Sequence, residues 1–475
     1  MEKTKNGKKG GSKSFLKGAL WIAIGGFTAK IIGALYRIPL TNLIGGRGLG
    51  LYQLVYPVYC LLLTVSATGI PSSIAKLTAE RIEKDGNDRA VFKTAMKLFL
   101  WIGALGAGLM ALIAPLLASA QGSKEVLSGY FALAPSVFLV SAISVFRGWF
   151  QGKNKMFPTA ASEVLEQLVK VGFGLFFAYW FRDNVAKAVV FLLLSVSISE
   201  LATVFLMLAF YKREKTPREP SKGGGRVGMK SILRLSIPVT FSSILLPVSG
   251  LLDSVLAPRL LGAYATDAVT LFGLFSGGAV TVINLPVSIC YGIAAASVPS
   301  VASAAAQAEN GKKSGVRRRI FYALGITVLV SAPSALGLYF FAEPAAKIIF
   351  RSLAGDELQV LVSLIKAFSV SALTLSCVQT LSACLTAQGK PQYSALSMLI
   401  AVTVKTAVYA FLLRDPKISV LGLAYATNVC YLVAFVLDLV YNLYVSRKRK
   451  AKGERTEHDY DHRLGSGKRG LDGAR

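Results

Sequence analysis

Residues 188–211 read AVVFLLLSVSISELATVFLMLAFY, a run in which Glu200 is the single charged residue. A helix that crosses the hydrocarbon core of a bilayer needs about 20 predominantly apolar residues, so this run is long enough to span a membrane. Comparable runs recur along the 475-residue chain, separated by short charged stretches, and they number about twelve. The sequence therefore predicts an all-α polytopic membrane protein.

The amino-acid composition narrows the class of protein further. Hydrophobic residues make up 53% of the chain and charged residues 16%, a balance that excludes disordered and collagen-like proteins and argues against an ordinary soluble enzyme. The formal net charge of +28, from 53 Lys and Arg against 25 Asp and Glu, at first suggests a nucleic-acid partner. The basic residues lie between the apolar runs, however, where the positive-inside rule explains them. Nucleic acid is therefore excluded as a partner.

The apolar runs define the expected helices. The first run, 15–40, is too long for the core of a signal peptide and lacks a small-residue cleavage signature, so we interpret it as a retained helix. The sequence predicts helices over residues 15–40, 50–74, 95–119, 126–147, 158–181, 188–211, 231–252, 268–301, 320–342, 359–386, 392–413 and 419–444. Two more short spans are compatible with the sequence and would raise the number from twelve to fourteen.

The distribution of Lys and Arg predicts the orientation in the membrane. With the N-terminus placed inside, 39 of the 53 basic residues fall on the cytoplasmic side, 10 in the opposite loops and 4 within helices. Cytoplasmic loops of membrane proteins carry an excess of Lys and Arg. The chain is therefore predicted to be a multi-pass protein of the cell membrane with both termini in the cytoplasm. The basic tail, 445–475, is expected to be disordered and to attract anionic membrane lipids.

A weak internal repeat indicates two similar halves. Gln151–Lys153 follows the fourth expected helix of the first half, and Gln388–Lys390 follows the fourth of the second; both read QGK. The next helix of each half carries a lysine, Lys170 and Lys405. Because each half has an even number of helices, the halves share one orientation and are related by an axis along the membrane normal.

The repeat predicts two six-helix bundles around a central cleft, which is the architecture of a transporter that works by alternating access. The expected segments are a basic cytoplasmic stretch at 1–14, an N-terminal bundle at 15–211, a cytoplasmic linker at 212–230, a C-terminal bundle at 231–444, and the basic tail at 445–475.

Charged side chains within the expected helices are the candidate functional residues. An ionisable group is costly in a bilayer and usually faces the interior of a bundle or a water-filled cavity. The residues of this kind are Lys30, Glu163, Glu166, Lys170, Glu200, Lys366, Lys405 and Asp438. Glu163, Glu166 and Lys170 have the spacing of a single helix face. That face is either a structural Glu166–Lys170 pair or a polar stripe that lines the cleft, and the sequence leaves both interpretations open.

The deep lysines suggest an anionic substrate. Lys170 and Lys405 lie near the middle of their helices, too far from either surface to reach water easily. The pyrophosphate of a lipid-linked saccharide would satisfy such lysines, because lysine is a competent phosphate ligand. We therefore predict that Lys170 and Lys405 bind substrate. The carboxylates of Glu166, Glu200 and Asp438 are candidates for coupling transport to H⁺ or Na⁺.

Metal and catalytic chemistry find no support in the sequence. All five cysteines fall inside apolar segments without the spacing of zinc ligands, and the two histidines, His458 and His462, lie in the hydrophilic tail. A membrane enzyme such as a glycan polymerase would need an acid–base or metal cluster at one membrane face. We therefore expect no metal, no cofactor and no enzymatic activity.

Four stretches resemble the stage V sporulation protein B and polysaccharide biosynthesis protein family. They are Ala29–Leu40 (AKIIGALYRIPL), Gly45–Gln53 (GGRGLGLYQ), Gly69–Lys76 (GIPSSIAK) and Arg147–Gly152 (RGWFQG), and the likeness extends over residues 14–444. The resemblance implies the multidrug/oligosaccharidyl-lipid/polysaccharide (MOP) exporter superfamily, which contains flippases of lipid-linked saccharides as well as drug antiporters.

The resemblance also implies site residues on the first helix. Lipid II flippases of this superfamily carry a basic residue, a glycine and an arginine there, and Lys30, Gly33 and Arg37 are similar, with Arg37 one position late. Lys30 and Arg37 thus join the predicted substrate-binding residues. The acidic–basic pair that those flippases place before a proline on the eighth helix is absent before Pro286, where the sequence reads VTVINL.

Residues and resemblance together predict a flippase for an undecaprenyl-pyrophosphate-linked saccharide, such as a peptidoglycan precursor of the cell wall or spore cortex. H⁺, Na⁺ or the membrane potential would drive it. The alternative is a cation-coupled multidrug antiporter of the same superfamily. Lys30 argues against that alternative, because a cation-binding carboxylate would be expected in the cleft of the first bundle.

Overall fold

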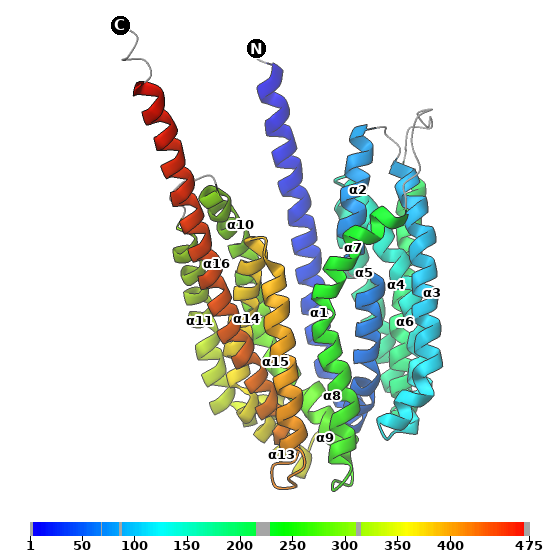
Figure 1. Ribbon diagram of the computed structural model, residues 1–475. Coiled ribbons are helices and arrows are strands. Elements are labelled where there is room, and N and C mark those ends of the chain that lie inside the picture. Colours follow the sequence, from blue (N-terminus) through cyan, green and yellow to red (C-terminus); the bar gives the residue numbers. More distant parts are fainter. Residues whose placement is uncertain (1–2, 68, 85–87, 215–228, 310–314, 470–475) are drawn as a thin grey trace. The chain divides into compact units, whose positions relative to one another are not determined.

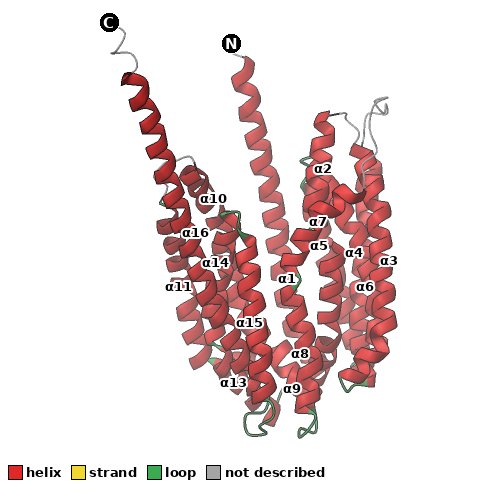
Figure 2. Ribbon diagram, in the orientation of Figure 1, coloured by secondary structure: helices red, strands yellow, loops and turns green. Residues whose placement is uncertain are grey.

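The computed structural model describes residues 3–67, 69–84, 88–214, 229–309 and 315–469, with side chains described mainly from residue 25 to residue 448. Within these ranges the regular secondary structure is helical throughout (Figures 1 and 2). The α-helices are α1 (Lys3–Ala67), α2 (Ile70–Lys84), α3 (Asp88–Ala120), α4 (Leu127–Gly152), α5 (Phe157–Trp180), α6 (Val185–Arg213), α7 (Met229–Ser243), α8 (Leu245–Leu261), α9 (Ala268–Gly273), α10 (Val280–Glu309), α11 (Val316–Phe340), α12 (Ala342–Ile349), α13 (Gly355–Phe368), α14 (Val370–Ala387), α15 (Pro391–Leu412) and α16 (Leu421–Arg469).

Several of the expected helices are interrupted or divided in the structure. α1 is interrupted at Gly45, whose φ of 65° is in the left-handed region that glycine adopts without steric cost. This break separates the helices expected over 15–40 and 50–74. The helix expected over 231–252 is divided into α7 and α8, and a π-helical turn, Leu274–Ala279, separates α9 from α10. At the other end, α16 continues to Arg469, into a tail rich in the good helix formers Lys and Arg, for which disorder was expected.

Among the described residues, nine helical segments are long and apolar enough to cross a membrane. The first of them, residues 31–84, contains the break at Gly45 and so more than one span. α5 falls outside the nine because it carries Glu163, Glu166 and Lys170, while α7 and α8 are short. The expected all-α membrane fold is confirmed, and twelve spans are compatible with these segments.

The outer face of α3 shows how the surface suits lipid. Trp101, Leu105, Leu109, Leu112 and Leu116 recur every three or four residues and are all exposed. In water such a stripe would be buried against a partner, whereas a bilayer is an apolar solvent for it. This face is therefore built to contact hydrocarbon.

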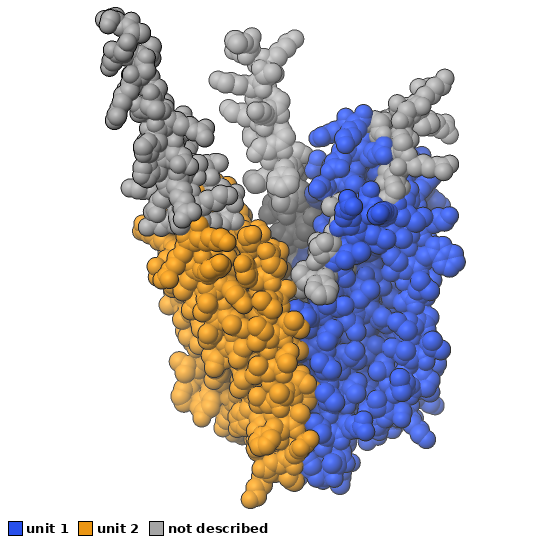
Figure 3. All heavy atoms as spheres, in the orientation of Figure 1, with its two compact units in different colours: residues 1–278, 346–360 blue, residues 279–345, 361–475 orange. Residues whose placement is uncertain are grey.

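Contacts divide the chain into two compact units (Figure 3). Unit 1 comprises residues 1–278 and 346–360, and unit 2 comprises residues 279–345 and 361–475. α7, α8 and α9 thus group with unit 1. The expected division into membrane bundles at 15–211 and 231–444 stays a prediction.

Unit 1 is assembled around α4, which packs against α2, α3 and α6. Phe92, Phe146, Trp149 and Tyr211 form an aromatic cluster at one end of these helices, with Phe92 stacked on Tyr211 at 4.5 Å between ring centroids. At the same end Lys153 Nζ lies 2.9 Å from Asp88 Oδ2 and 3.4 Å from Glu214 Oε1. Three segments expected on the cytoplasmic side therefore lie together at one end of this unit.

Unit 2 is assembled around α14, which packs against α10, α11 and α16, while α15 packs mainly against α16. Its buried cluster joins Val301, Ala304, Val316, Ile320 and Leu381. The Gln388 side-chain amide donates to Asn442 Oδ1 at 2.9 Å, and Asn442 in turn donates to the Leu381 carbonyl at 3.0 Å. These bonds fix the end of α14, and with it the QGK loop, against α16.

Candidate functional site

A buried ion pair joins α4 to α5 inside unit 1. Arg147 on α4 donates from Nη2 to Glu166 Oε2 at 2.9 Å and from Nε to Ser162 Oγ at 2.9 Å. Ser162 and Glu166 are one turn apart on α5 and therefore share a face. The two charged side chains are only 18% and 20% exposed, so the pair is largely shielded from solvent and lipid by the protein.

Glu200 places a second carboxylate near this pair, from α6. It is 2% exposed, and its Oε1 accepts a hydrogen bond of 3.3 Å from the Tyr59 hydroxyl on α1. Its Oε2 has no hydrogen-bond partner among the described residues. Tyr59 ends a row of tyrosines on α1, in which Tyr52 stacks on Tyr56 at 5.0 Å and Tyr56 lies 5.7 Å from Tyr59. Glu200 is therefore a deeply buried acid beside the tyrosine row of α1.

Lys170 lies on α5 one turn beyond Glu166. It is half-buried and within electrostatic range of Glu166, Glu200 and Arg37. Among the described residues, the ion-pair partner of Glu166 is Arg147 and not Lys170. Lys170 is thus a cation held inside the unit near two carboxylates, one of which is already paired.

The first helix presents its small residues to the polar face of α5. A Cβ added at Gly26 would lie 3.5 Å from Glu163 Oε2, and one added at Gly33 would lie 3.4 Å from Gln167 Oε1. Arg37 follows on the same helix and is half-buried. The Lys30 side chain lies outside the described residues.

Unit 2 contains its own buried charges. Asp438 on α16 is 1% exposed and accepts a hydrogen bond of 2.7 Å from the Ser382 hydroxyl on α14. Ser382 also bonds Ser394 on α15 at 2.6 Å, so three helices meet at this carboxylate. Lys405, on α15, is 5% exposed.

The predicted residues are therefore divided between two clusters. Arg37, Glu166, Lys170 and Glu200 come together in unit 1, whereas Lys405 and Asp438 belong to unit 2. A single cationic cluster of Lys30, Lys170 and Lys405 stays a prediction.

Sequence reasoning missed Arg147 and Tyr59. Arg147 is the last residue of the helix expected over 126–147, but α4 continues to Gly152, and the Arg147 guanidinium contacts Glu166 on α5. An arginine one and a half turns before a helix end gives no sequence signal of its partner. Tyr59 is 141 residues from Glu200, a separation that no local pattern bridges.

A model of the family described as polysaccharide biosynthesis protein matches residues 15–305 of this chain. The chain belongs to this family. The matched range includes all of the unit 1 cluster and ends within α10, so Arg37, Glu166, Lys170 and Glu200 lie in the part of the chain that matches the family.

The chain is similar to proteins of Bacillus subtilis (strain 168). It is 26% identical to stage V sporulation protein B over 430 residues, which cover 87% of this chain and 80% of the relative. It is 20% identical to the lipid II flippase MurJ over 452 residues, covering 88% and 82%. The expected family resemblance is confirmed.

Solved structures show the same fold. An inward-facing multidrug resistance MATE family transporter of the MOP superfamily superposes with a TM-score of 0.71 at 16% identity, covering 90% of this chain and 96% of that one. The lipid II flippase MurJ in an inward closed conformation superposes with a TM-score of 0.68 at 14% identity, covering 91% and 90%. The chain therefore shares the fold of these two transporters.

Proposed function

We propose that this protein is a flippase that moves a lipid-linked saccharide, carried on undecaprenyl pyrophosphate, across the cell membrane by alternating access. The observation that carries the proposal is the gathering of Arg37, Arg147 and Lys170 in the interior of unit 1 of a MOP fold. Glu166 is already paired with Arg147, so a substrate pyrophosphate can provide an anion for the neighbouring Lys170 during transport. Membership in the polysaccharide biosynthesis protein family and the similarity to a lipid II flippase support this substrate class.

The cations take different parts in this proposal. Arg147 is held by Glu166 and Ser162 and positions α5. Lys170 and Arg37 bind the pyrophosphate from α5 and α1, and Lys30 and Lys405 are the other substrate-binding candidates. The protein's part is binding and conformational change, with no covalent step.

Ion coupling belongs to the buried carboxylates. Glu200 is the strongest candidate, because a carboxylate that is 2% exposed with one oxygen lacking a hydrogen-bond partner among the described residues is favoured when it holds a proton or a cation. Glu166 and Asp438 are the other candidates. Glu200→Gln should abolish the dependence of transport on a pH or Na⁺ gradient, whereas Tyr59→Phe should keep it.

The same carboxylate favours a second candidate function, a cation-coupled multidrug antiporter. Such an antiporter needs a buried acid that exchanges a cation for the drug, and a multidrug resistance MATE family transporter shares this fold. Overexpression would then confer resistance to cationic dyes, and the resistance would be lost in Glu200→Gln.

Depletion of the protein separates the two functions. A flippase predicts that a lipid-linked saccharide precursor accumulates on the cytoplasmic side, and chemical analysis of that precursor identifies the saccharide. Lys170→Gln, expressed at normal abundance, should reproduce the accumulation. Depletion without accumulation of any lipid-linked precursor would contradict the flippase.

A further inference from the structure

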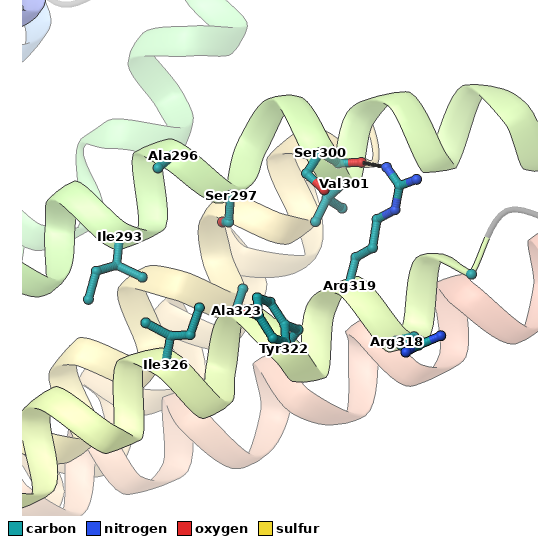
Figure 4. A pocket seen from close by; sticks show the side chains of 11 residues that line it. Ile293, Ala296, Ser297, Ser300, Val301, Arg318, Arg319, Tyr322, Ala323 and Ile326 are labelled. Carbon is teal, nitrogen blue, oxygen red and sulfur yellow. Dashed lines mark hydrogen bonds between the residues drawn. The ribbon is translucent and has the colours of Figure 1, made fainter.

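Unit 2 contains a groove that is separate from its buried charges. A cavity of about 630 Å³ lies between the C-terminal half of α10 and the first turns of α11 (Figure 4). Five of its lining residues come from α10 and the rest from α11 and its N-terminal glycine. The two ends of the groove differ in chemistry, and that difference identifies its ligand.

One end of the groove is cationic. Arg319 reaches across from α11 and donates from Nη1 to the Ser300 carbonyl at 2.6 Å, which fixes its guanidinium at the mouth (Figure 4). Arg318 lines the same end. Among the described residues, no carboxylate lies within ion-pairing distance of either arginine. An arginine keeps four N–H donors after making one hydrogen bond, so this end can accept an anion.

The position of these arginines at a helix N-terminus is electrostatically unfavourable unless an anion is bound there. Residues 317–319 read RRR in the first turn of α11, next to the positive end of the helix dipole, where cations are unfavourable. Lys312 and Lys313 precede them in the sequence. A bound anion would be stabilised by the guanidinium groups and by the unpaired amides of the helix N-terminus together.

The other end of the groove is apolar. Ile293 and Ala296 on α10 face Ala323 and Ile326 on α11, away from the arginines (Figure 4). From Arg319 to Ile326 the helix rises about 10 Å, roughly a third of the hydrocarbon core of a bilayer. Tyr322, beside this path, is 73% exposed, so the groove opens on the outer surface of the unit.

We propose that this groove binds an anionic phospholipid of the cytoplasmic leaflet. Its phosphate contacts Arg318 and Arg319, and one acyl chain follows the apolar floor toward Ile293 and Ile326. The Lys and Arg asymmetry predicts that residues 312–319 lie on the cytoplasmic side, which places the cationic end of the groove at the depth of the headgroups. Basic pockets between transmembrane helices on this side suit anionic lipid headgroups.

The test measures lipids retained by the purified full-length protein. Protein is exchanged into micelles that contain equal amounts of phosphatidylglycerol and phosphatidylcholine, and bound lipids are counted by native mass spectrometry. The wild type should retain phosphatidylglycerol in preference to phosphatidylcholine. Arg318→Gln with Arg319→Gln should lower that retention about tenfold or more, because each charge-assisted hydrogen bond contributes strongly.

Arg317 provides a matched control on the same turn. Its guanidinium lies 5.5 Å from the Phe321 ring centroid and does not line the groove. Arg317→Gln removes one positive charge from the same turn, as each of Arg318→Gln and Arg319→Gln does, and should leave retention within about twofold. Equal losses in Arg317→Gln and in the double variant would overturn the site, since they would indicate general charge attraction.

A second variant tests the apolar end without touching the arginines. Ala296→Trp should fill the floor and lower phosphatidylglycerol retention, while the protein stays monodisperse on gel filtration. Unchanged retention in Ala296→Trp, or full displacement of the lipid by inorganic phosphate, would reduce the site to a phosphate contact and contradict the proposal. Displacement by undecaprenyl pyrophosphate but not by added phosphatidylglycerol would assign the groove to the substrate carrier and contradict it as well.

Discussion

Arg147 and Glu166 form an ion pair inside a membrane bundle, where each charge is compensated mainly by the other. Removing one partner leaves an uncompensated charge at a site where both side chains are at most 20% exposed. Such single removals from buried pairs cost about 3–5 kcal/mol, while replacing both partners costs much less. The pair therefore joins α4 to α5, and the protein loses most stability when only one of the two charges is removed.

The first prediction concerns this junction. Arg147→Gln and Glu166→Gln should each lower the thermal stability of the purified protein, and the double variant should recover much of the loss. Lys187→Gln, at an exposed position at the start of α6, is the control and should be neutral. Additive losses in the double variant, measured in a double-mutant cycle, would show that the pair is not coupled.

Glu357 provides a second prediction, on pH dependence. It lies on α13 outside the membrane-spanning segments, where burial and the neighbouring Asp267 carboxylate raise its pKa above the usual value. A carboxyl whose pKa is raised by folding favours the folded state when protonated, so its contribution is present at low pH and is lost as the pH rises through the folded-state pKa. Glu357→Gln should flatten the dependence of melting temperature on pH in the range above the usual glutamate pKa. An unchanged profile in Glu357→Gln would contradict the prediction.

At the scale of elements, α4 packs against α2 through two glycines. A Cβ on Gly148 would lie 2.8 Å from the Pro71 backbone, and one on Gly152 would lie 2.6 Å from the Ala75 carbonyl oxygen. Glycines four residues apart allow membrane helices to approach closely, because no side chains stand between the two backbones. The RGWFQG stretch is thus a packing surface at the end of α4.

The third prediction follows from that contact. Gly148→Val and Gly152→Val should reduce the amount of folded protein in the membrane by forcing α2 away from α4. Gly172→Ala is the matched control, since a Cβ there meets no other atom within 4 Å. The measurement is the fluorescence-detected gel-filtration peak of tagged protein. Normal peaks for both valine variants would show that α2 and α4 can separate without cost.

At the scale of the whole molecule, the fourth prediction concerns orientation. A cysteine at Ser123, between α3 and α4, should react with membrane-impermeant thiol reagents in intact cells. A cysteine at Ser221, which lies outside the described residues in the linker, should resist them. Background labelling should be low, because four of the five native cysteines are buried and Cys60 is half-buried. The reverse pattern would overturn the cytoplasmic placement of both termini and the proposed direction of transport.

Membrane class, helix content and family were readable from the sequence alone. An apolar run of the length seen at 188–211 has few alternatives to a spanning helix, because unpaired backbone groups are too costly in hydrocarbon. Motifs such as GGRGLGLYQ and RGWFQG sufficed for the family, since they are contiguous. The positions of Glu166, Lys170 and Glu200 on buried helix faces were also predictable from their charge within apolar runs.

Tertiary structure alone decided the partners. The local spacing left open a Glu166–Lys170 pair or a polar stripe, but the side chain that reaches Glu166 comes from Arg147 on another helix. The Glu200 partner Tyr59 is 141 residues away. The division of 231–252 into α7 and α8 and the grouping of 346–360 with unit 1 were equally unreadable. The physical reason is that hydrophobicity determines which segments enter a membrane, whereas the rotation and crossing of each helix, set by packing with distant helices, determine which side chains meet.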